Sequence, residues 1–448
     1  MAYIPHSEDE RRQMLAAIGI DRLDDLYDAV PESVRFPDLD LPPGVSEMEI
    51  MDELQALSEA NLDMGHTACF LGAGAYNHFI PSVVDHVLRR NEFYTAYTPY
   101  QPEVSQGTLQ AIFEYQSLIS NLTGMQVANA SLYDGATALA EAVSMALSHH
   151  RGKRRKIVLS PAIHPHYRQV ARTYLGGMEV SIVGDEIVAN GLPALTGLLD
   201  EDTALVAVQY PDFFGRIDDF SELGRVAHEA GALLCVVVNP LALGLLRPPS
   251  EFAADIVVGE GQSLGIPLSY GGPYVGLMAT TQALVRKMPG RLVGETLDVR
   301  GQRGYVLTLT PREQHIRREK ATSNICTNQG LMALAALVYL SALGKYGLRQ
   351  VAELCYHKAH YAADKITALE GYPMWGEAPF FHEFVVKCPR PVTEINESLL
   401  EGHDILGGYD LGQAYPELAG HMLIAVTERN ASEDIDEFAS ALQEAADA

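Results

Sequence analysis

Lysine, cysteine and tryptophan are scarce in this sequence. The 448 residues contain one tryptophan and five cysteines, and the cysteines are scattered with no C-x-x-C pair. An odd number of isolated cysteines argues against a disulfide framework and a zinc site, and it is typical of reduced cytosolic thiols. Eight lysines are present, at positions 153, 156, 287, 320, 345, 358, 365 and 387. The basic side chains are therefore mostly arginine.

Long apolar segments are also missing. The two longest, residues 232–246 and 330–344, are shorter than the ~20 residues that a membrane-spanning helix needs. The acidic stretch that begins at Ser7 is typical of a helix start and differs from a basic secretory signal. These features favour a cytoplasmic protein with no membrane partner.

Positive charge is in short supply as well. There are 32 Lys and Arg residues against 58 Asp and Glu residues, which gives a net charge of −26. So negative a chain argues against nucleic acids and anionic membranes as partners. The 47% hydrophobic content is sufficient for a large core, and the length suggests two or three domains.

Residues 1–69 are predicted to form a helical N-terminal arm. Amphipathic helices are expected at residues 7–18, 23–29 and 46–57, and a proline-rich stretch at 31–43 separates the last two. The apolar faces of such helices need a surface to pack on. We therefore expect the arm to lie across the main body or a partner.

Residues 70–320 are predicted to form one large α/β domain with a charged connector at 290–320. Short Val-, Ile- and Leu-rich runs without polar alternation are separated by helical segments of about a dozen residues, which indicates a parallel sheet covered on both faces. The expected strands are residues 126–131, 156–160, 180–183, 204–210, 232–238, 256–258 and 274–278.

Residues 321–448 are predicted to form a smaller α+β domain. Its expected helices are residues 324–343, 347–369, 394–400 and 433–446, and its expected strands are 380–387 and 422–427.

Ligands of such sheets bind at the carboxyl ends of the strands, and three segments are expected there. The helix start at residues 133–137 suits a phosphate, although simple N-capping by Asp134 explains it too. The second segment is Asn239, an amide at the end of a buried strand. The third is the glycine-rich loop 259–273, which lacks lysine, histidine and cysteine and has only Glu260 and Tyr270 as ionisable side chains.

Other patterns are less specific. The glycines of residues 72–77 follow no convincing strand, so we reject a dinucleotide-binding fingerprint. His164 and His166 lack acidic or cysteine neighbours, which favours helix capping over a metal site. The tyrosines of residues 94–103 could deliver hydroxyl groups to a neighbouring site or form aromatic surface packing.

Five long stretches resemble the P-proteins of the glycine cleavage system, which belong to the fold type I pyridoxal-phosphate enzymes. They are YTPYQPEVSQGTLQAIFEYQ from Tyr97, NASLYDGATALAEA from Asn129, HPHYRQV from His164, GEGQSLGIPLSYGGPYVG from Gly259, and the segment from Met288 that ends in ATSNICTNQ. The closer resemblance is to the alpha subunit of the two-subunit form. It implies an aminotransferase-like fold of type I with a mostly parallel central sheet.

The resemblance also implies that this chain has lost its own catalytic groups. Fold type I enzymes hold pyridoxal phosphate through a lysine after one strand and pair its ring nitrogen with a carboxylate at the end of another. Gln262 stands in place of the Schiff-base lysine, and Asn239 stands in place of the acid. An amide cannot bind the cofactor covalently, and a neutral asparagine cannot stabilise a protonated ring as a carboxylate does.

The resemblance further implies partners. A catalytic beta subunit would supply the lysine and the covalently bound pyridoxal phosphate, in an α2β2 assembly that acts on glycine and on lipoylated H-protein. This chain would complete the partner's site with Tyr97 and Tyr100. Thr322, Ser323 and Asn324, expected to open a long helix, would contact the cofactor phosphate or serve as a simple N-cap.

Two alternatives stay open. The chain could be a structural or regulatory pseudo-enzyme that does not enter the partner's site. It could also be a self-sufficient pyridoxal-phosphate lyase that uses another lysine, with Lys287 and Lys320 as the candidates, although both lie in charged stretches typical of solvent-exposed positions.

Overall fold

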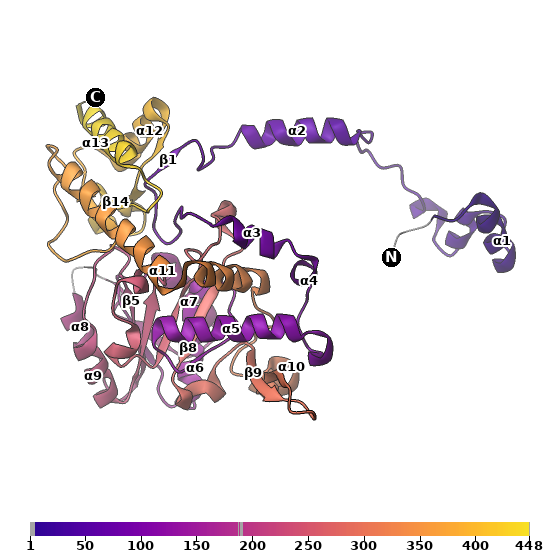
Figure 1. The fold of residues 1–448 in the computed structure, drawn as a ribbon, viewed down its shortest axis with the longest axis horizontal. Coiled ribbons are helices and arrows are strands. Elements are labelled where there is room, and N and C mark those ends of the chain that lie inside the picture. The colour runs from indigo at the N-terminus through magenta and orange to yellow at the C-terminus, as the bar shows by residue number, and fades with distance from the viewer. Residues whose placement is uncertain (1–4, 187, 189–190, 448) are drawn as a thin grey trace. The chain divides into compact units, whose positions relative to one another are not determined.

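The computed structural model describes residues 5–186, 188 and 191–447 (Figure 1). Its contacts divide the chain into two compact units, Met1–Leu62 and Asp63–Ala448. The predicted finer boundaries at 69/70 and 320/321 remain predictions.

The first unit consists of short helices without a core of their own. It contains α1 (Glu8–Ile18), the 3-10 turns Leu23–Tyr27 and Glu32–Val34, and α2 (Glu47–Glu59). Capping boxes begin both α-helices, because Ser7 pairs with Glu10 and Ser46 with Glu49. The helix predicted at residues 23–29 is only a 3-10 turn. Within the described part of these elements no residue is buried, so their apolar side chains lie in solvent.

The second unit is built on a central sheet of seven strands among the described residues, in the order β2-β8-β7-β6-β5-β3-β4. These strands are β2 (Val127–Ala128), β3 (Lys156–Leu159), β4 (Ser181–Val183), β5 (Thr203–Tyr210), β6 (Leu233–Val238), β7 (Ile256–Glu260) and β8 (Gly276–Thr280). β4, β3, β5, β6 and β7 are parallel, as predicted. β8 pairs antiparallel with both β7 and β2. The sequence analysis placed residues 274–278 in a parallel sheet, and this direction is wrong for β8. The loop before β8 contains only the short 3-10 turn Ser269–Gly271 and no crossover helix, which a parallel neighbour of β7 would need.

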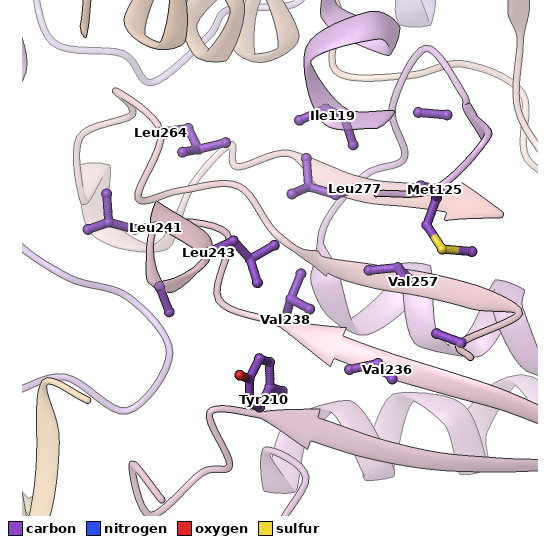
Figure 2. Packing of buried hydrophobic residues seen from close by; sticks show 14 of the residues in the cluster. Ile119, Met125, Tyr210, Val236, Val238, Leu241, Leu243, Val257, Leu264 and Leu277 are labelled. Carbon is purple, nitrogen blue, oxygen red and sulfur yellow. The ribbon is translucent and has the colours of Figure 1, made fainter. Parts of the chain in front are cut away.

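Both faces of the sheet are buried, which explains its apolar strands. Val236 and Val238 pack with α5 (Gln106–Thr123) and the long helix α11 (Gly330–Thr367). Figure 2 shows these two valines in one cluster with Ile119 of α5. Cys235 and Val237 point to the other face and pack in the cluster that contains α6 (Gly135–His149). The remaining helices of this part are α3 (Ser82–Leu88), α4 (Asn91–Tyr94), α7 (Pro165–Leu175), α8 (Gly191–Gly197) and α9 (Ser221–Ala230).

The helix α11 joins two segments that were predicted as separate helices. It is continuous apart from a break at Gly344, whose φ is 59°. Its first half lies in the main core, and residues from Ala359 to Ile366 pack in the C-terminal core. By length and composition α11 is the one described helix that could cross a membrane, and much of it is buried in the two cores.

The prediction that this helix begins at Asn324 is wrong. The described residues 322–329 form an irregular segment, and α11 begins at Gly330. Tertiary contacts hold the segment out of the helix: the side chain of Asn328 donates to the carbonyl oxygen of Ala130, and the N–H of Gln329 donates to the hydroxyl of Ser131. Propensity alone does not reveal these contacts.

The predicted connector and small α+β region follow. The connector contains an unpredicted hairpin, β9 (Leu292–Leu297) with β10 (Arg303–Thr308), and the short α10 (Gln314–Arg317). The C-terminal region contains α12 (Val392–His403), α13 (Ser432–Asp447) and an antiparallel sheet of β11 (Glu383–Lys387), β14 (His421–Ala425) and β13 (Tyr409–Asp410). β1 (Ala68–Cys69) pairs in parallel with β12 (Ile405–Leu406) and so ties the start of this unit to its end.

Candidate functional site

Gln262 and Asn239 lie on one small cavity at the carboxyl ends of β6 and β7. This is the position that the sequence predicted for a fold type I cofactor site. The cavity has a volume of about 30 Å³. Its lining consists of Gly74, Tyr76, His164, Tyr167, Gln209, Val237, Val238, Asn239, Glu260, Gln262 and Ser263.

The side chain of Gln262 is buried and fully hydrogen-bonded. Its Oε1 accepts from the backbone N–H of Tyr76 at 2.8 Å, and its Nε2 donates to the carbonyl oxygen of Tyr76 at 2.9 Å. The same Nε2 donates to the carbonyl oxygen of Ile266 at 2.8 Å. Gln262 therefore holds the segment 72–77 against the end of β7.

Glu260, the last residue of β7, binds three backbone N–H groups. Its Oε2 accepts from Gly135 at 2.9 Å, and its Oε1 accepts from Gln262 and Val275 at 3.1 Å each. Burial raises the pKa of Glu260 to about 8, although the N–H donors oppose this shift. The carboxyl group thus closes the start of α6 from the side of the cavity.

Asp134 closes the start of α6 from its own end. Its side chain accepts from the N–H of Thr137 at 2.7 Å, and the Thr137 hydroxyl lies 3.2 Å from the backbone N–H of Asp134. This capping box confirms the N-cap interpretation of residues 133–137.

His164 and Tyr167 cover another wall of the cavity. Their rings are stacked, with centroids 4.7 Å apart. His164 Nε2 is 2.8 Å from the carbonyl oxygen of Ala73, and its Nδ1 accepts from the N–H of His166, as expected for a helix cap. Burial lowers the pKa of His164 to about 4, so the ring is neutral at physiological pH. Among the described residues, a cluster with the spacing of metal ligands lies elsewhere, at His78, Cys355 and Glu428.

Glu383 of the C-terminal region binds the segment whose residues Gly74 and Tyr76 line this cavity. Its Oε1 accepts from the N–H of Ala73, and its Oε2 accepts from the hydroxyl of Tyr76, both at 2.8 Å. Burial raises the pKa of Glu383 to about 7. Segment 72–77 is thus bound by Gln262 after β7, by His164 at the start of α7 and by Glu383 of β11.

These residues do not fit pyridoxal phosphate. Pockets for molecules of that size measure about 300 Å³ or more, ten times the volume of this cavity. The helix N-terminus that suits a phosphate is already bound to Glu260. Asn239 Oδ1 accepts from the N–H of Leu241, and its Nδ2 is buried without a partner among the described residues.

Tyr97 lies away from this cleft. Its side chain is 80% exposed and lines the rim of a second, largely apolar cavity of about 410 Å³. Residues of α5 and of the start of α11 line it, together with Thr327 and Asn328. Within the described residues no side chain lines both this cavity and that of Gln262.

Tyr100 contacts Arg291, a residue that the sequence did not single out. The guanidinium of Arg291 donates to the Tyr100 hydroxyl at 3.0 Å and lies 5.4 Å from the ring centroid. It also donates to the carbonyl oxygen of Cys326 at 2.6 Å. Arg291 is 4% exposed and has no carboxylate partner in the described part of the chain.

The segment 322–324 lies beside the same arginine. Thr322 and Ser323 line a small cleft with Arg291 and Arg312. The Ser323 hydroxyl accepts from the N–H of Ile325 at 3.0 Å. These hydroxyls do not cap α11, which starts only at Gly330, so the N-cap interpretation is wrong. Asn324 is exposed.

The two lysines considered as alternatives lie outside the cleft. Lys287 donates to the hydroxyl of Ser148 at 3.3 Å, and Lys320 is exposed. Neither lines the cavity of Gln262. Glu260, Tyr76 and Glu383 were not predicted as site residues; for Glu260 the available signal was its place as an ionisable residue in a loop without reactive groups.

The chain is similar to known proteins over its whole length. It matches the family model "Glycine cleavage system P-protein" over residues 1–442. A protein of Thermomicrobium roseum named "Probable glycine dehydrogenase (decarboxylating) subunit 1" is 57% identical over 99% of this chain and 100% of that protein. The protein of the same name from Geobacillus kaustophilus is 53% identical over 98% of each.

Solved structures agree with these matches. The structure of a glycine decarboxylase (P-protein) of the glycine cleavage system in inhibitor-bound form has a TM-score of 0.90 and 43% identity, and covers 99% of this chain and 100% of that one. A sphingosine-1-phosphate lyase of Burkholderia pseudomallei has a TM-score of 0.65 at 16% identity over 93% of this chain and 94% of that one, which shows the fold alone. The chain belongs to the glycine cleavage system P-protein family.

Proposed function

We propose that this chain is the subunit without a cofactor lysine in a two-subunit glycine decarboxylase. A catalytic beta subunit supplies the lysine and binds pyridoxal phosphate covalently. The pair decarboxylates glycine and transfers the aminomethyl group to lipoylated H-protein. The cofactor provides the electron sink for decarboxylation when it is bound to the partner.

One observation carries this proposal: the cleft where a fold type I enzyme holds its cofactor is occupied by the chain's own groups. Gln262 offers an amide in place of an amine, and its three hydrogen bonds tie it to backbone groups. A P-protein with such a cleft needs a second polypeptide for the reaction.

The exposed tyrosine and hydroxyl groups support a role in the partner's site. Tyr97 is exposed and lines a cavity whose volume lies in the range of ligand pockets. Arg291 fixes Tyr100 and the backbone at Cys326, so it holds both loops in place. Tyr97, Tyr100, Thr322, Ser323 and Asn324 are the residues that we assign to the wall of the partner's site. Their part is to orient the bound molecule and exclude water.

The first unit supports extensive contact with a partner subunit. Met48, Met51, Leu54 and Leu57 of α2 are each more than half exposed. Each is three residues from the next, so successive members are neighbours on the helix surface and form an apolar stripe. Apolar stripes of this kind are covered in stable assemblies. We assign α2 to the interface of an α2β2 assembly, which we expect in the cytoplasm.

The experiment is a turnover measurement on the assembled pair with Tyr97→Phe. The residue is 80% exposed, and its hydroxyl forms no side-chain hydrogen bond with the described residues, so we expect intact assembly and a lower rate of glycine decarboxylation. Val104→Ala, at a position that is 77% exposed, is the matched control. Unchanged turnover in the tyrosine variant would favour the structural pseudo-enzyme instead.

A separate measurement excludes the self-sufficient lyase. The purified chain is mixed with pyridoxal phosphate and reduced with borohydride. We expect no lysine adduct by mass spectrometry, and an adduct at Lys287 or Lys320 would contradict the proposal.

A further inference from the structure

The start of α6 carries an internal carboxyl group at the place where a helix binds an anion. Free backbone N–H groups and the helix dipole make such a start favourable for phosphate. Here the N–H of Gly135 donates to Glu260 at 2.9 Å, and the N–H of Thr137 donates to Asp134 at 2.7 Å. The helix has 15 residues, so its dipole is fully developed.

The backbone around Glu260 is shaped to receive this side chain. A Cβ atom at Gly135 would lie 2.9 Å from the backbone nitrogen of Glu260 and 2.5 Å from the hydroxyl of Tyr167. Only glycine therefore allows β7 and α6 to approach so closely. Two further N–H groups, of Gln262 and Val275, converge on the other oxygen of Glu260. One carboxyl group thus satisfies three backbone donors around the cleft.

We propose that the Glu260 carboxyl group is an internal substitute for the cofactor phosphate, and that two independent interactions close the cleft of this chain. The first interaction is the hydrogen bond between Glu260 and the N–H of Gly135 at the start of α6. The second is the pairing of Gln262 with segment 72–77, whose Gly74 and Tyr76 line the same cavity as Asn239. Glu383 of the C-terminal region binds the same segment, so segment 72–77 now connects the C-terminal region to the end of β7.

Because two interactions close the cleft, we expect that a lysine at position 262 alone is insufficient for cofactor binding. Gln262→Lys removes the acceptor for the N–H of Tyr76 but leaves Glu260 on the N–H of Gly135, where its side chain excludes a phosphate by volume. The double variant Gln262→Lys with Glu260→Ser removes both interactions and places an amine directly after β7. Only the double variant is then expected to bind pyridoxal phosphate in this cleft.

The test uses the full-length chain, alone and with its partner subunit. Each variant is incubated with pyridoxal phosphate and reduced with borohydride, and adducts are located by peptide mass spectrometry. We expect an adduct at residue 262 in the double variant and at least ten times less in Gln262→Lys alone. Equal labelling of the two would overturn the proposal, and so would no labelling of a folded double variant.

A second readout does not depend on the lysine. Inorganic phosphate should stabilise Glu260→Ser, because the N–H of Gly135 becomes free, and it should leave the wild-type chain unchanged. At a phosphate concentration ten times its dissociation constant, the rise in the unfolding temperature is about 1–2 °C for a chain of this length. Glu260→Gln, which keeps the side-chain volume and one oxygen acceptor, is the matched control with no expected rise. Sodium chloride at equal ionic strength separates site binding from a general salt effect. A Glu260→Ser chain that folds and shows no rise would contradict the role of Glu260. The proposed function does not depend on this result, since it concerns the partner's site.

Discussion

The side-chain amide of Gln262 pairs in both directions with the backbone of Tyr76. Its oxygen accepts from the N–H of Tyr76 at 2.8 Å, and its nitrogen donates to the carbonyl oxygen of the same residue at 2.9 Å. A lysine can make only the second of these contacts, because an ammonium group has no acceptor. The residue that replaces the expected lysine thus has a structural role of its own.

Gln262→Ala is expected to destabilise the chain by about 3 kcal/mol. It leaves the buried N–H and carbonyl groups of Tyr76 without partners, and each unsatisfied group costs about 1–3 kcal/mol. The measurement is the midpoint of urea unfolding. The control is Gln282→Ala, because the side chain of Gln282 is exposed and its hydrogen bond to Gln126 uses the backbone N–H. Its unfolding free energy should change by less than about 0.5 kcal/mol.

Glu260 gives the stability of the chain a definite pH dependence. Its pKa is raised to about 8 in the folded state, so the folded chain keeps a proton that the unfolded chain releases near the ordinary carboxyl value of 4.5. The folded state therefore loses stability as the pH rises between these values, by up to about 1.4 kcal/mol per pH unit. Above about pH 8 the contribution is gone.

The variant Glu260→Gln isolates this effect. The difference in unfolding free energy between wild type and variant should fall from pH 5 to pH 8 and become flat above pH 8. Other buried carboxyl groups with raised pKa values, such as Glu383 and Glu141, titrate in both proteins and cancel. A difference that does not change with pH would show that Glu260 is ionised throughout.

Gly215→Ala is expected to destabilise the chain by about 2–4 kcal/mol or to prevent folding. Gly215 has a φ of 84°, and an added Cβ would lie 1.9 Å from the carbonyl oxygen of Glu383. Glu383, which binds segment 72–77, would have to move. Gly107→Ala in α5 is the matched control: no atom lies within 4 Å of its added Cβ, so its stability should change by less than about 1 kcal/mol. Thermal unfolding distinguishes the two.

Tyr97 and Tyr100 should separate in their effects on stability. Tyr100→Phe removes a hydroxyl that accepts from the buried Arg291, at a cost of about 1.5 kcal/mol. Tyr97→Phe removes an exposed hydroxyl and should change stability by less than about 0.5 kcal/mol. The measurement is urea unfolding of the isolated chain. Equal losses in both variants would mean that Tyr97 has a fold contact of its own.

Leu54→Glu should weaken assembly with the partner and leave the second unit folded. A charge on the apolar side of α2 has to be desolvated when that side is covered. Analytical ultracentrifugation with the partner subunit measures the dissociation constant, for which we expect an increase of at least tenfold. Glu53→Gln, the neighbouring substitution, is the control. Undiminished affinity of Leu54→Glu would place the interface elsewhere.

The sequence by itself determined the type of fold and most of its elements. Apolar runs without alternation predicted the parallel strands β3 to β7, because strands buried on both faces have no polar side. Ser7, Ser46 and Asp134 predicted helix starts that the structure has, since capping depends on contacts three residues apart. Gln262 and Asn239 were predicted to lie together, because the carboxyl ends of neighbouring parallel strands meet at one edge.

Tertiary structure alone decided what fills that edge. The partners of Gln262 and Glu260 are distant in the chain, at Tyr76 and Gly135, and no local pattern encodes such contacts. The same reason explains the wrong start of α11: contacts to Ala130 and Ser131 keep residues 328 and 329 out of a helix that local propensity favours. Helix caps and the periodicity of burial depend on residues that are close in the sequence, so the sequence predicts them. The closing of a cleft depends on which distant segments the folded chain brings together.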